Sequence, residues 1–181
     1  MAAPPDKFIG NLNGRWLLNK TLSDDYERVM SLQGVAWLVR KAICRASTTI
    51  SIRQEGVGPA TTIALDNTSN LGVQGTTEVR QLDWEFATHN DFVWGNVRGR
   101  SKFVSITDTP AGFPAANARD DAQNEDSELL YNEIEALNGS WKSQMLWGFE
   151  IIDGSRYFVR HVKASRGSEH ATARLVYNYL A

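Results

Sequence analysis

The residues best suited to contact a ligand are basic side chains in segments that have the composition of β-strands. Arg98 and Arg100 are two positions apart, and Lys102 continues the series. Because side chains two apart lie on the same face of a strand, these three groups form one basic row. The row lies either on the solvated outer face of a sheet or inside it, where it would donate hydrogen bonds to a ligand oxygen. The sequence leaves both alternatives open.

Tryptophan side chains supply a second kind of contact surface. Of the six tryptophans, Trp84, Trp94, Trp141 and Trp147 lie on four different expected β segments. Inward-facing tryptophans would give a cavity flat walls suited to polycyclic or polyene ligands, and the alternative is that they fill the core. Trp37, in an expected helix, faces either the cavity or solvent. The ligand-binding candidates are Trp37, Arg80, Trp84, Trp94, Arg98, Arg100, Trp147, Arg160, Arg174 and Tyr177.

Motifs for nucleophilic, metal or phosphate chemistry are absent from the sequence. There is no Gly-x-Ser-x-Gly, no His-Glu-x-x-His and no phosphate-binding loop. Cys44 is the single cysteine and the 3 histidines are scattered, so no zinc-ligand spacing exists. We therefore expect no metal and no cofactor, and the sequence identifies no catalytic residue. The 19 basic and 21 acidic residues nearly balance, which argues against nucleic acid as a partner.

The length of 181 residues is that of one domain. Residues 1–7 lack the charged and apolar regions of a secretory signal, and no apolar run approaches the length of a membrane span. We expect a cytoplasmic protein without an integral membrane segment. The sequence indicates no oligomeric state.

Short segments rich in β-forming residues, separated by Asn, Gly, Ser and Asp clusters, make up most of the chain. An Asp-Gly pair at 153–154 between two of them is a strong hairpin signal. This rhythm predicts an antiparallel barrel or sandwich rather than βαβ units. The predicted strands cover 14–19, 48–54, 61–65, 75–83, 92–97, 102–106, 141–152, 157–163 and 171–180.

Two helices are predicted near the N-terminus. Ser23 is a suitable N-cap for a short helix over 24–32, because carboxylates follow it in the first turn. Gly34 ends that helix, and apolar residues at helical spacing then predict a second helix that ends near Arg45. A helix pair at the start of an otherwise β chain is placed where it could close the mouth of a barrel.

Residues 107–138 interrupt the series of strands. The first part has the Pro, Gly and charged residues of a surface loop, and Ser127 predicts a short helix over 127–137. Loops of this length are uncommon in compact domains. The segment is either an insertion without ligand contacts or a second lid element.

The opening of the chain resembles that of the intracellular fatty-acid-binding proteins of the calycin group. The resemblance is carried by Gly14-x-Trp16, the segment 23–30, Leu32-x-Gly34 and Arg40-Lys41, in nearly that family's order and spacing. The chain also resembles fungal lipocalin-like proteins. The resemblance implies a mainly β fold, an up-and-down antiparallel barrel of about ten strands with a helix-turn-helix lid, and barrels of that size leave a ligand cavity. It implies one calycin-like domain over 1–181 with an insertion at 107–138, and a structural role for Trp16 at the closed end.

One departure from that family concerns its carboxylate anchor, an Arg-x-Tyr in the last strand. Here Arg174 and Tyr177 are three residues apart, so on a regular strand they face opposite sides unless a bulge intervenes. The family's second arginine, two strands earlier, has no clear match near 147–152. A neutral or differently shaped ligand is therefore favoured over a fatty acid.

Two functions follow from these expectations. In the first, the chain binds a hydrophobic polyketide-, terpenoid- or lipid-like molecule in the barrel cavity, which apolar burial alone can account for. In the alternative, the same cavity folds a reactive substrate, and the protein is a cofactor-independent cyclase or isomerase of the pericyclase type in a natural-product pathway. A purely structural interaction protein is a third possibility.

Overall fold

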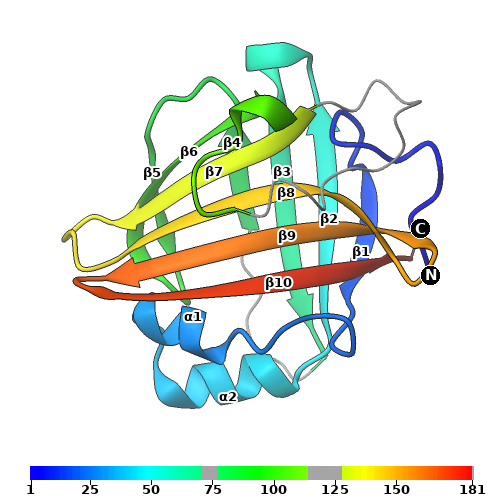
Figure 1. Cartoon of the computed structure of the whole chain (residues 1–181). Coiled ribbons are helices and arrows are strands. Elements are labelled where there is room, and N and C mark those ends of the chain that lie inside the picture. Colours follow the sequence, from blue (N-terminus) through cyan, green and yellow to red (C-terminus); the bar gives the residue numbers. More distant parts are fainter. Residues whose placement is uncertain (71–76, 114–127, 181) are drawn as a thin grey trace.

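The computed structural model describes residues 1–70, 77–113 and 128–180, and its ten antiparallel strands form a nearly closed barrel (Figure 1). The helices are α1 (Glu27–Leu32) and α2 (Trp37–Arg45), and they lie beneath the barrel in this view. The strands are β1 (Gly14–Leu18), β2 (Thr48–Glu55), β3 (Thr62–Ser69), β4 (Thr77–Gln81), β5 (Ala87–Asp91), β6 (Gly95–Ser105), β7 (Glu128–Ala136), β8 (Lys142–Ile152), β9 (Ser155–Arg166) and β10 (Glu169–Tyr179).

The strand order is that of an up-and-down barrel. The order is β4-β3-β2-β1-β10-β9-β8-β7-β6-β5, so the strands follow the chain and β1 joins β10. The two ends of the order are β4 and β5, and no hydrogen-bonded ladder joins them within the described residues. The expected barrel class and the expected helix pair near the N-terminus are confirmed.

The Gly-x-Trp opening contributes Trp16 to the barrel core. Trp16 is fully buried, donates from Nε1 to the Leu12 carbonyl at 2.9 Å, and packs against Phe158 at 5.1 Å between ring centroids. Its ring also meets Tyr179 at 4.9 Å. Gly14 adopts φ 132°, and a Cβ atom there would lie 2.6 Å from the Tyr179 ring. Glycine is therefore required so that Tyr179 can reach the tryptophan.

The lead-in to the first helix differs from the expectation. α1 begins at Glu27, and its N-cap residue has no side-chain capping bond. Ser23, expected as the cap, instead accepts a hydrogen bond from the Val176 N–H at 2.9 Å, and the carboxylate of Asp24 accepts one from the Arg174 N–H at 2.7 Å. These polar side chains therefore tie the lid to β10 rather than capping a helix, because the neighbouring strand offers unpaired amides.

The helix predicted over 127–137 is wrong, because residues 128–136 form β7. This strand pairs with β6 on one side and β8 on the other. Glu133 and Glu135 lie directly opposite Arg100 and Arg98 on β6, and such opposite-charge pairs stabilise neighbouring strands. Ser127, the expected cap, lies outside the described residues.

A second difference concerns residues 87–105. The strand predicted over 92–97 is wrong in its first part: 92–94 form a turn, and Gly95 begins a strand that continues to Ser105. Asp91 causes the turn, because its Oδ1 accepts the N–H groups of Val93 and Trp94 at 2.6 and 3.0 Å. The preceding strand, β5, is not among the predicted elements.

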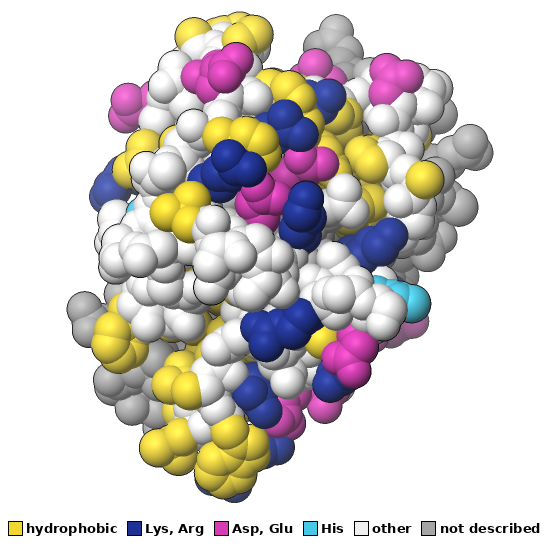
Figure 2. Space-filling view, turned by 90° about the vertical axis from the view of Figure 1, so that its left-hand side faces the viewer, with side chains coloured by type: hydrophobic (Ala, Val, Ile, Leu, Met, Phe, Trp, Pro, Cys, Tyr) yellow, Lys and Arg dark blue, Asp and Glu magenta, His cyan; other side chains and the backbone are white. Residues whose placement is uncertain are grey.

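Residues 106–113, between β6 and the undescribed residues, lie against the outside of the barrel. Phe113 and Ile106 pack on outer-face residues of β6, β7 and β8, among them Val104, Leu129 and Tyr131. Residues 114–127 lie outside the described residues, so a second lid stays a prediction. On α2, Trp37 and Leu38 are 62% and 71% exposed, and Figure 2 shows hydrophobic side chains at the lower end of the molecule, where the helix pair lies.

Candidate functional site

A cavity of about 170 Å³ lies inside the barrel at the end that α1 covers. On this scale one water needs roughly 10–15 Å³, so the space admits a multi-atom ligand. The helix pair contributes Tyr26, Val29, Met30, Gln33 and Ile43 to its wall. The apolar side chains that the strands contribute include Ile50, Leu65, Val97, Ile134, Met145, Val162 and Leu175.

Arg160 and Tyr177 form the central polar group of the cavity. They come from the neighbouring strands β9 and β10, and Arg160 Nη1 lies 3.5 Å from the Tyr177 hydroxyl, to which it donates. Arg160 Nη2 donates to the Met145 sulfur at 3.2 Å, and the guanidinium lies 4.3 Å from the centroid of the fully buried Trp147 ring. Arg160 Nε has no hydrogen-bond partner among the described residues. This guanidinium therefore has donor capacity left for a ligand.

Burial shifts the ionisation of both groups. It lowers the pKa of Arg160 and raises the pKa of Tyr177, and the cation at Arg160 partly offsets the second shift. The phenol of Tyr177 is therefore protonated and can donate a hydrogen bond. Burial likewise raises the pKa of Tyr26, the lid tyrosine that faces the same cavity.

Arg80 brings a second guanidinium into the cavity from β4. Arg80 is 8% exposed, and its Nη2 pairs with Glu78 Oε2 at 2.8 Å. Its guanidinium lies 5.4 Å from the centroid of the Trp147 ring, which Arg160 also contacts. Its Nε and Nη1 have no hydrogen-bond partner within the described part of the chain. The guanidinium groups of Arg80 and Arg160 thus both lie against Trp147, and Glu78 pairs with the first of them.

The spacing argument for Arg174 and Tyr177 holds in the structure. The ladder between β9 and β10 is continuous from Ala173 to Tyr177, so no bulge brings the two side chains together. Arg174 lies on the outer face, where it donates to the Leu22 carbonyl at 3.3 Å. The position two residues before Tyr177 holds Leu175, and Arg160 lies directly opposite it. The arginine beside the tyrosine therefore comes from β9 instead of β10.

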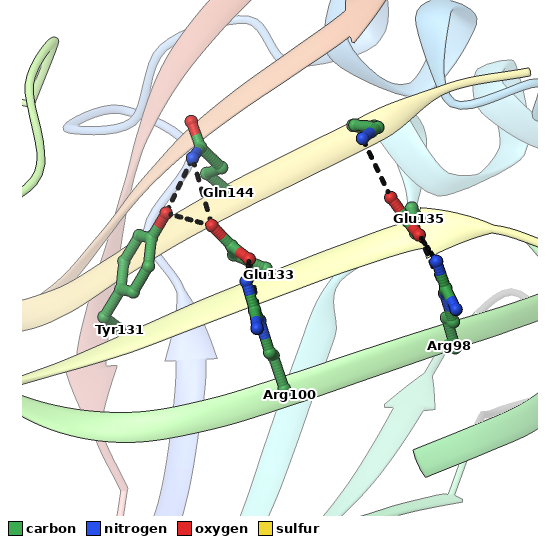
Figure 3. A network of polar contacts seen from close by, with 7 residues as sticks. Arg98, Arg100, Tyr131, Glu133, Glu135 and Gln144 are labelled. Carbon is green, nitrogen blue, oxygen red and sulfur yellow. Dashed lines mark hydrogen bonds and ion pairs between the residues drawn. The ribbon is translucent and has the colours of Figure 1, made fainter. Parts of the chain in front are cut away.

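Arg98 and Arg100 lie outside the cavity. Arg100 donates to Glu133 at 2.6 Å, Glu133 accepts from Tyr131 at 2.9 Å, and Arg98 pairs with Glu135 (Figure 3). The two arginines share a face, as their spacing predicts. Neither arginine lines the cavity, because the inward-facing positions of β6 are the alternate residues, such as Val97 and Gly99. Their role as ligand-binding residues of the cavity is therefore not supported.

The network on the outer face predicts a pH dependence of stability. Burial raises the pKa of Glu133, but hydrogen bonds from Arg100 and Tyr131 outweigh it and the net shift is downward. The hydrogen bond from Arg98 lowers the pKa of Glu135. A carboxylate with a lowered pKa in the folded state stabilises the fold above its unfolded value, and that contribution is lost as the pH falls through the folded value.

We therefore expect the free energy of unfolding to fall as the pH drops below the ordinary glutamate value of 4.5. The double variant E133Q/E135Q should show a shallower fall over the same range. Urea denaturation between roughly pH 3 and 7 measures both curves. The exposed Glu55→Gln variant is the control, and parallel curves for the double variant and the wild type would contradict the assignment.

The tryptophans divide between the cavity wall, the core and the outside of the barrel, and the candidate Trp147 lies in the core cluster rather than on the cavity wall. Trp94 and Trp141 line the cavity, and Trp94 Nε1 donates to Gln33 Oε1 on the lid at 3.2 Å. Trp84 is outside: it lies in the connection between β4 and β5, and the guanidinium of Arg100 sits 4.0 Å from its ring. Trp37 is exposed on α2 and does not line the cavity. Trp84, Trp94 and Trp141 lie outside the strands expected to carry them.

Several cavity residues are missing from the sequence-based candidates. They are Tyr26, Gln33, Glu78, His89, Asp91 and Trp141. Glu78 has a usable signal, because it lies two residues before the candidate Arg80. His89 and Asp91 alternate in the same way on β5, which is not among the strands predicted from the sequence.

Two general properties of the described residues bear on the class of site. No group of three or more His, Cys, Asp and Glu side chains among them could hold a metal ion. No helix in the described ranges combines the length and the apolar character that crossing a bilayer requires.

Comparison with known proteins gives two kinds of relative. No protein-family model matches the chain. The chain is 29% identical over 185 residues to Pericyclase pydY of Acremonium sp, covering 99% of this chain and 97% of that protein. It is 28% identical over 184 residues to Probable pericyclase scpY of Mollisia scopiformis, covering 99% and 95%. Both matches extend over almost the whole of each protein.

Solved structures share the fold. The Schistosoma mansoni fatty acid binding protein in complex with arachidonic acid superposes with a TM-score of 0.59 at 15% identity, covering 93% of this chain and 96% of that one. The Caenorhabditis elegans lipid binding protein 8 gives a TM-score of 0.60 at 15% identity, covering 93% and 94%. The resemblance to fatty-acid-binding barrels is therefore confirmed for the fold.

Proposed function

We propose that the chain binds a mainly apolar small molecule in the barrel cavity and promotes an intramolecular pericyclic cyclisation of it. The observation that carries the proposal is the pair Arg160 and Tyr177, two hydrogen-bond donors aimed into an otherwise largely apolar cavity under a lid. The two full-length relatives described as pericyclases support the reaction class. The barrel fold shared with lipid-binding proteins supports the binding step.

Binding and orientation require only what the cavity wall supplies. Apolar lining residues such as Leu65, Val97 and Val162 stabilise a hydrocarbon chain by about 25 cal/mol per Å² removed from water. A flexible chain folded so that its reacting ends meet loses entropy before the reaction rather than during it, and such preorganisation can accelerate a cyclisation greatly. The flat rings of Trp94 and Trp141 restrict how the chain can fold.

The polar pair acts on the electrons of the substrate. A pericyclic cyclisation converts π bonds into σ bonds within one molecule, and no atom enters or leaves. When Arg160 and Tyr177 donate to a carbonyl conjugated with one reacting alkene, they withdraw electron density from that alkene and stabilise the charge that shifts onto the oxygen. Donors in a low-dielectric site are worth more than the same donors in water.

The test is incubation with a linear substrate that carries a conjugated diene and, on the same chain, an alkene activated by a carbonyl. We expect faster cyclisation than in buffer and one dominant stereoisomer, measured by chiral chromatography. A product mixture that matches the protein-free reaction in rate and composition would refute catalysis.

A second candidate function is carriage of the same class of molecule without chemistry. The observation that favours it is the fold alone, since the Schistosoma mansoni neighbour is described as holding arachidonic acid. Displacement of a fluorescent fatty-acid probe by the diene substrate, combined with an unchanged cyclisation rate, is the result expected of a carrier. Displacement together with a single stereoisomeric product is the result expected of the enzyme.

A further inference from the structure

The cavity holds a second set of polar side chains, on the wall opposite Arg160. His89 and Asp91 both line the cavity, and they lie on β5, which is separated from β9 by β8, β7 and β6 in the sheet order. Nothing in the comparisons or in the proposed role of Arg160 accounts for them.

The two residues sit at the lid end of the barrel. Asp91 pairs with Gly95 at the tip of the β5–β6 hairpin, and the same tip carries Trp94, which donates to Gln33 of the lid. Trp147, on which Arg80 and Arg160 lie, instead packs against Phe158 of the core at 5.9 Å. His89 and Asp91 therefore lie nearer the helix pair than Arg80 and Arg160 do, and on a different part of the cavity wall.

The hydrogen bonding of His89 is incomplete. Its Nε2 is buried, has no hydrogen-bond partner among the described residues, and lies 3.6 Å from Asp91 Oδ2. That separation is too long for a hydrogen bond between the two atoms. Asp91 Oδ1 is already used by the N–H groups of Val93 and Trp94, whereas no hydrogen bond to Oδ2 is recorded among the described residues. Buried polar atoms ordinarily have partners.

We propose that His89 and Asp91 form a second polar subsite that binds a hydroxyl or amide N–H of the ligand. His89 Nε2 is unpaired among the described residues, Asp91 Oδ2 is an acceptor, and both residues line the cavity, so a hydroxyl or amide N–H that enters between them can donate to the carboxylate within reach of the imidazole. The ligand class is therefore a molecule that is apolar in the middle, carries an oxygen acceptor for Arg160 and Tyr177, and carries a donor group toward the lid. The inference deepens the proposed function and rests on it, because it assumes that the cavity is the binding site.

The subsite is tested with two matched series of probes: the unbranched saturated fatty acids of 8, 10 and 12 carbons, and the same acids with a terminal hydroxyl. Binding is measured by isothermal titration calorimetry. The carboxylate lies toward Arg160, and the terminal hydroxyl of one chain length should reach His89. For that length we expect the hydroxyl to increase affinity about fivefold, the effect of about one net hydrogen bond.

Two variants separate a specific contact from a general effect. His89→Leu should remove the increase. Asp91→Asn should reduce it, because the variant loses the Oδ2 acceptor, and the turn should persist, because the amide keeps an Oδ1 acceptor for it. His170→Gln is the matched control, because His170 is exposed on β10. It should keep the full increase.

The outcomes are distinguishable from failure of the proposed function. Absence of binding by any acid in either series would argue against a cavity for apolar ligands altogether. Binding of both series with no increase from the hydroxyl at any length, or an equal increase in His89→Leu, would overturn the subsite while leaving the cavity and its chemistry intact.

Discussion

Replacing Arg160 with methionine is expected to lower the rate of the proposed cyclisation by about 100-fold while leaving the barrel at least as stable. Loss of one preorganised donor at a developing negative charge typically costs a factor of about 10²–10³ in kcat. The stability effect has the opposite sign. A cation enclosed in the barrel has lost its hydration, and Arg160 has no carboxylate within salt-bridge distance among the described residues.

Methionine suits this position because it is unbranched and keeps contact with Trp147 and Met145. The measurements are kcat/KM with the diene substrate and the midpoint of thermal unfolding. Arg98→Met is the matched control: Arg98 lies on the outer face and pairs with Glu135, so its loss should leave the rate unchanged. A wild-type rate in Arg160→Met would show that the cavity acts by shape alone. If the chain is only a carrier, the same variant lowers its affinity for ligands that carry a carbonyl or carboxylate oxygen.

The architecture could be predicted because its signals are local. Gly14-x-Trp16, the breaks at Gly34 and Asp153-Gly154, and the β-branched residues of β2 each act through neighbouring residues. The opposite orientations of Arg174 and Tyr177 follow in the same way from the two-residue period of a strand. These expectations needed no knowledge of which strands are neighbours.

The predictions that failed concern features that depend on pairing between residues distant in the sequence. The spacing of Arg98 and Arg100 shows that they share a face but not which face, and their carboxylate partners lie more than thirty residues away on β7. The possible cap at Ser127 favours a helix over 127–137, whereas the ladders of β7 to β6 and β8, which join residues distant in the sequence, make it a strand.

The short polar strand β5 illustrates the same limit. Its sequence, Ala-Thr-His-Asn-Asp, has little β propensity, and only its ladder to β6 makes it a strand. The candidate residues His89 and Asp91 were therefore not identified from the sequence. The candidates on long strands, Arg160 and Tyr177, were identified because their strands have strong signals of their own.

Replacing Trp16 with alanine is expected to lower the free energy of unfolding by about 3–5 kcal/mol, the usual cost of removing a large buried aromatic side chain. Trp16 is fully buried, and its ring lies within 6.1 Å of the Phe149 centroid as well as against Phe158 and Tyr179. Its Nε1 also satisfies the Leu12 carbonyl, which alanine would leave unpaired. Urea denaturation monitored by circular dichroism measures the change.

Trp37→Ala is the control, because Trp37 is 62% exposed and its loss should change stability by less than about 0.5 kcal/mol. Equal effects of the two variants would contradict the assignment of Trp16 to the core. The comparison also tests how the site is held, because Phe158 joins Trp16 to Trp147, on which Arg160 lies. If that chain of aromatic contacts positions the guanidinium, Trp16→Ala should lower ligand affinity even under conditions where the variant is fully folded, whereas Trp37→Ala should not.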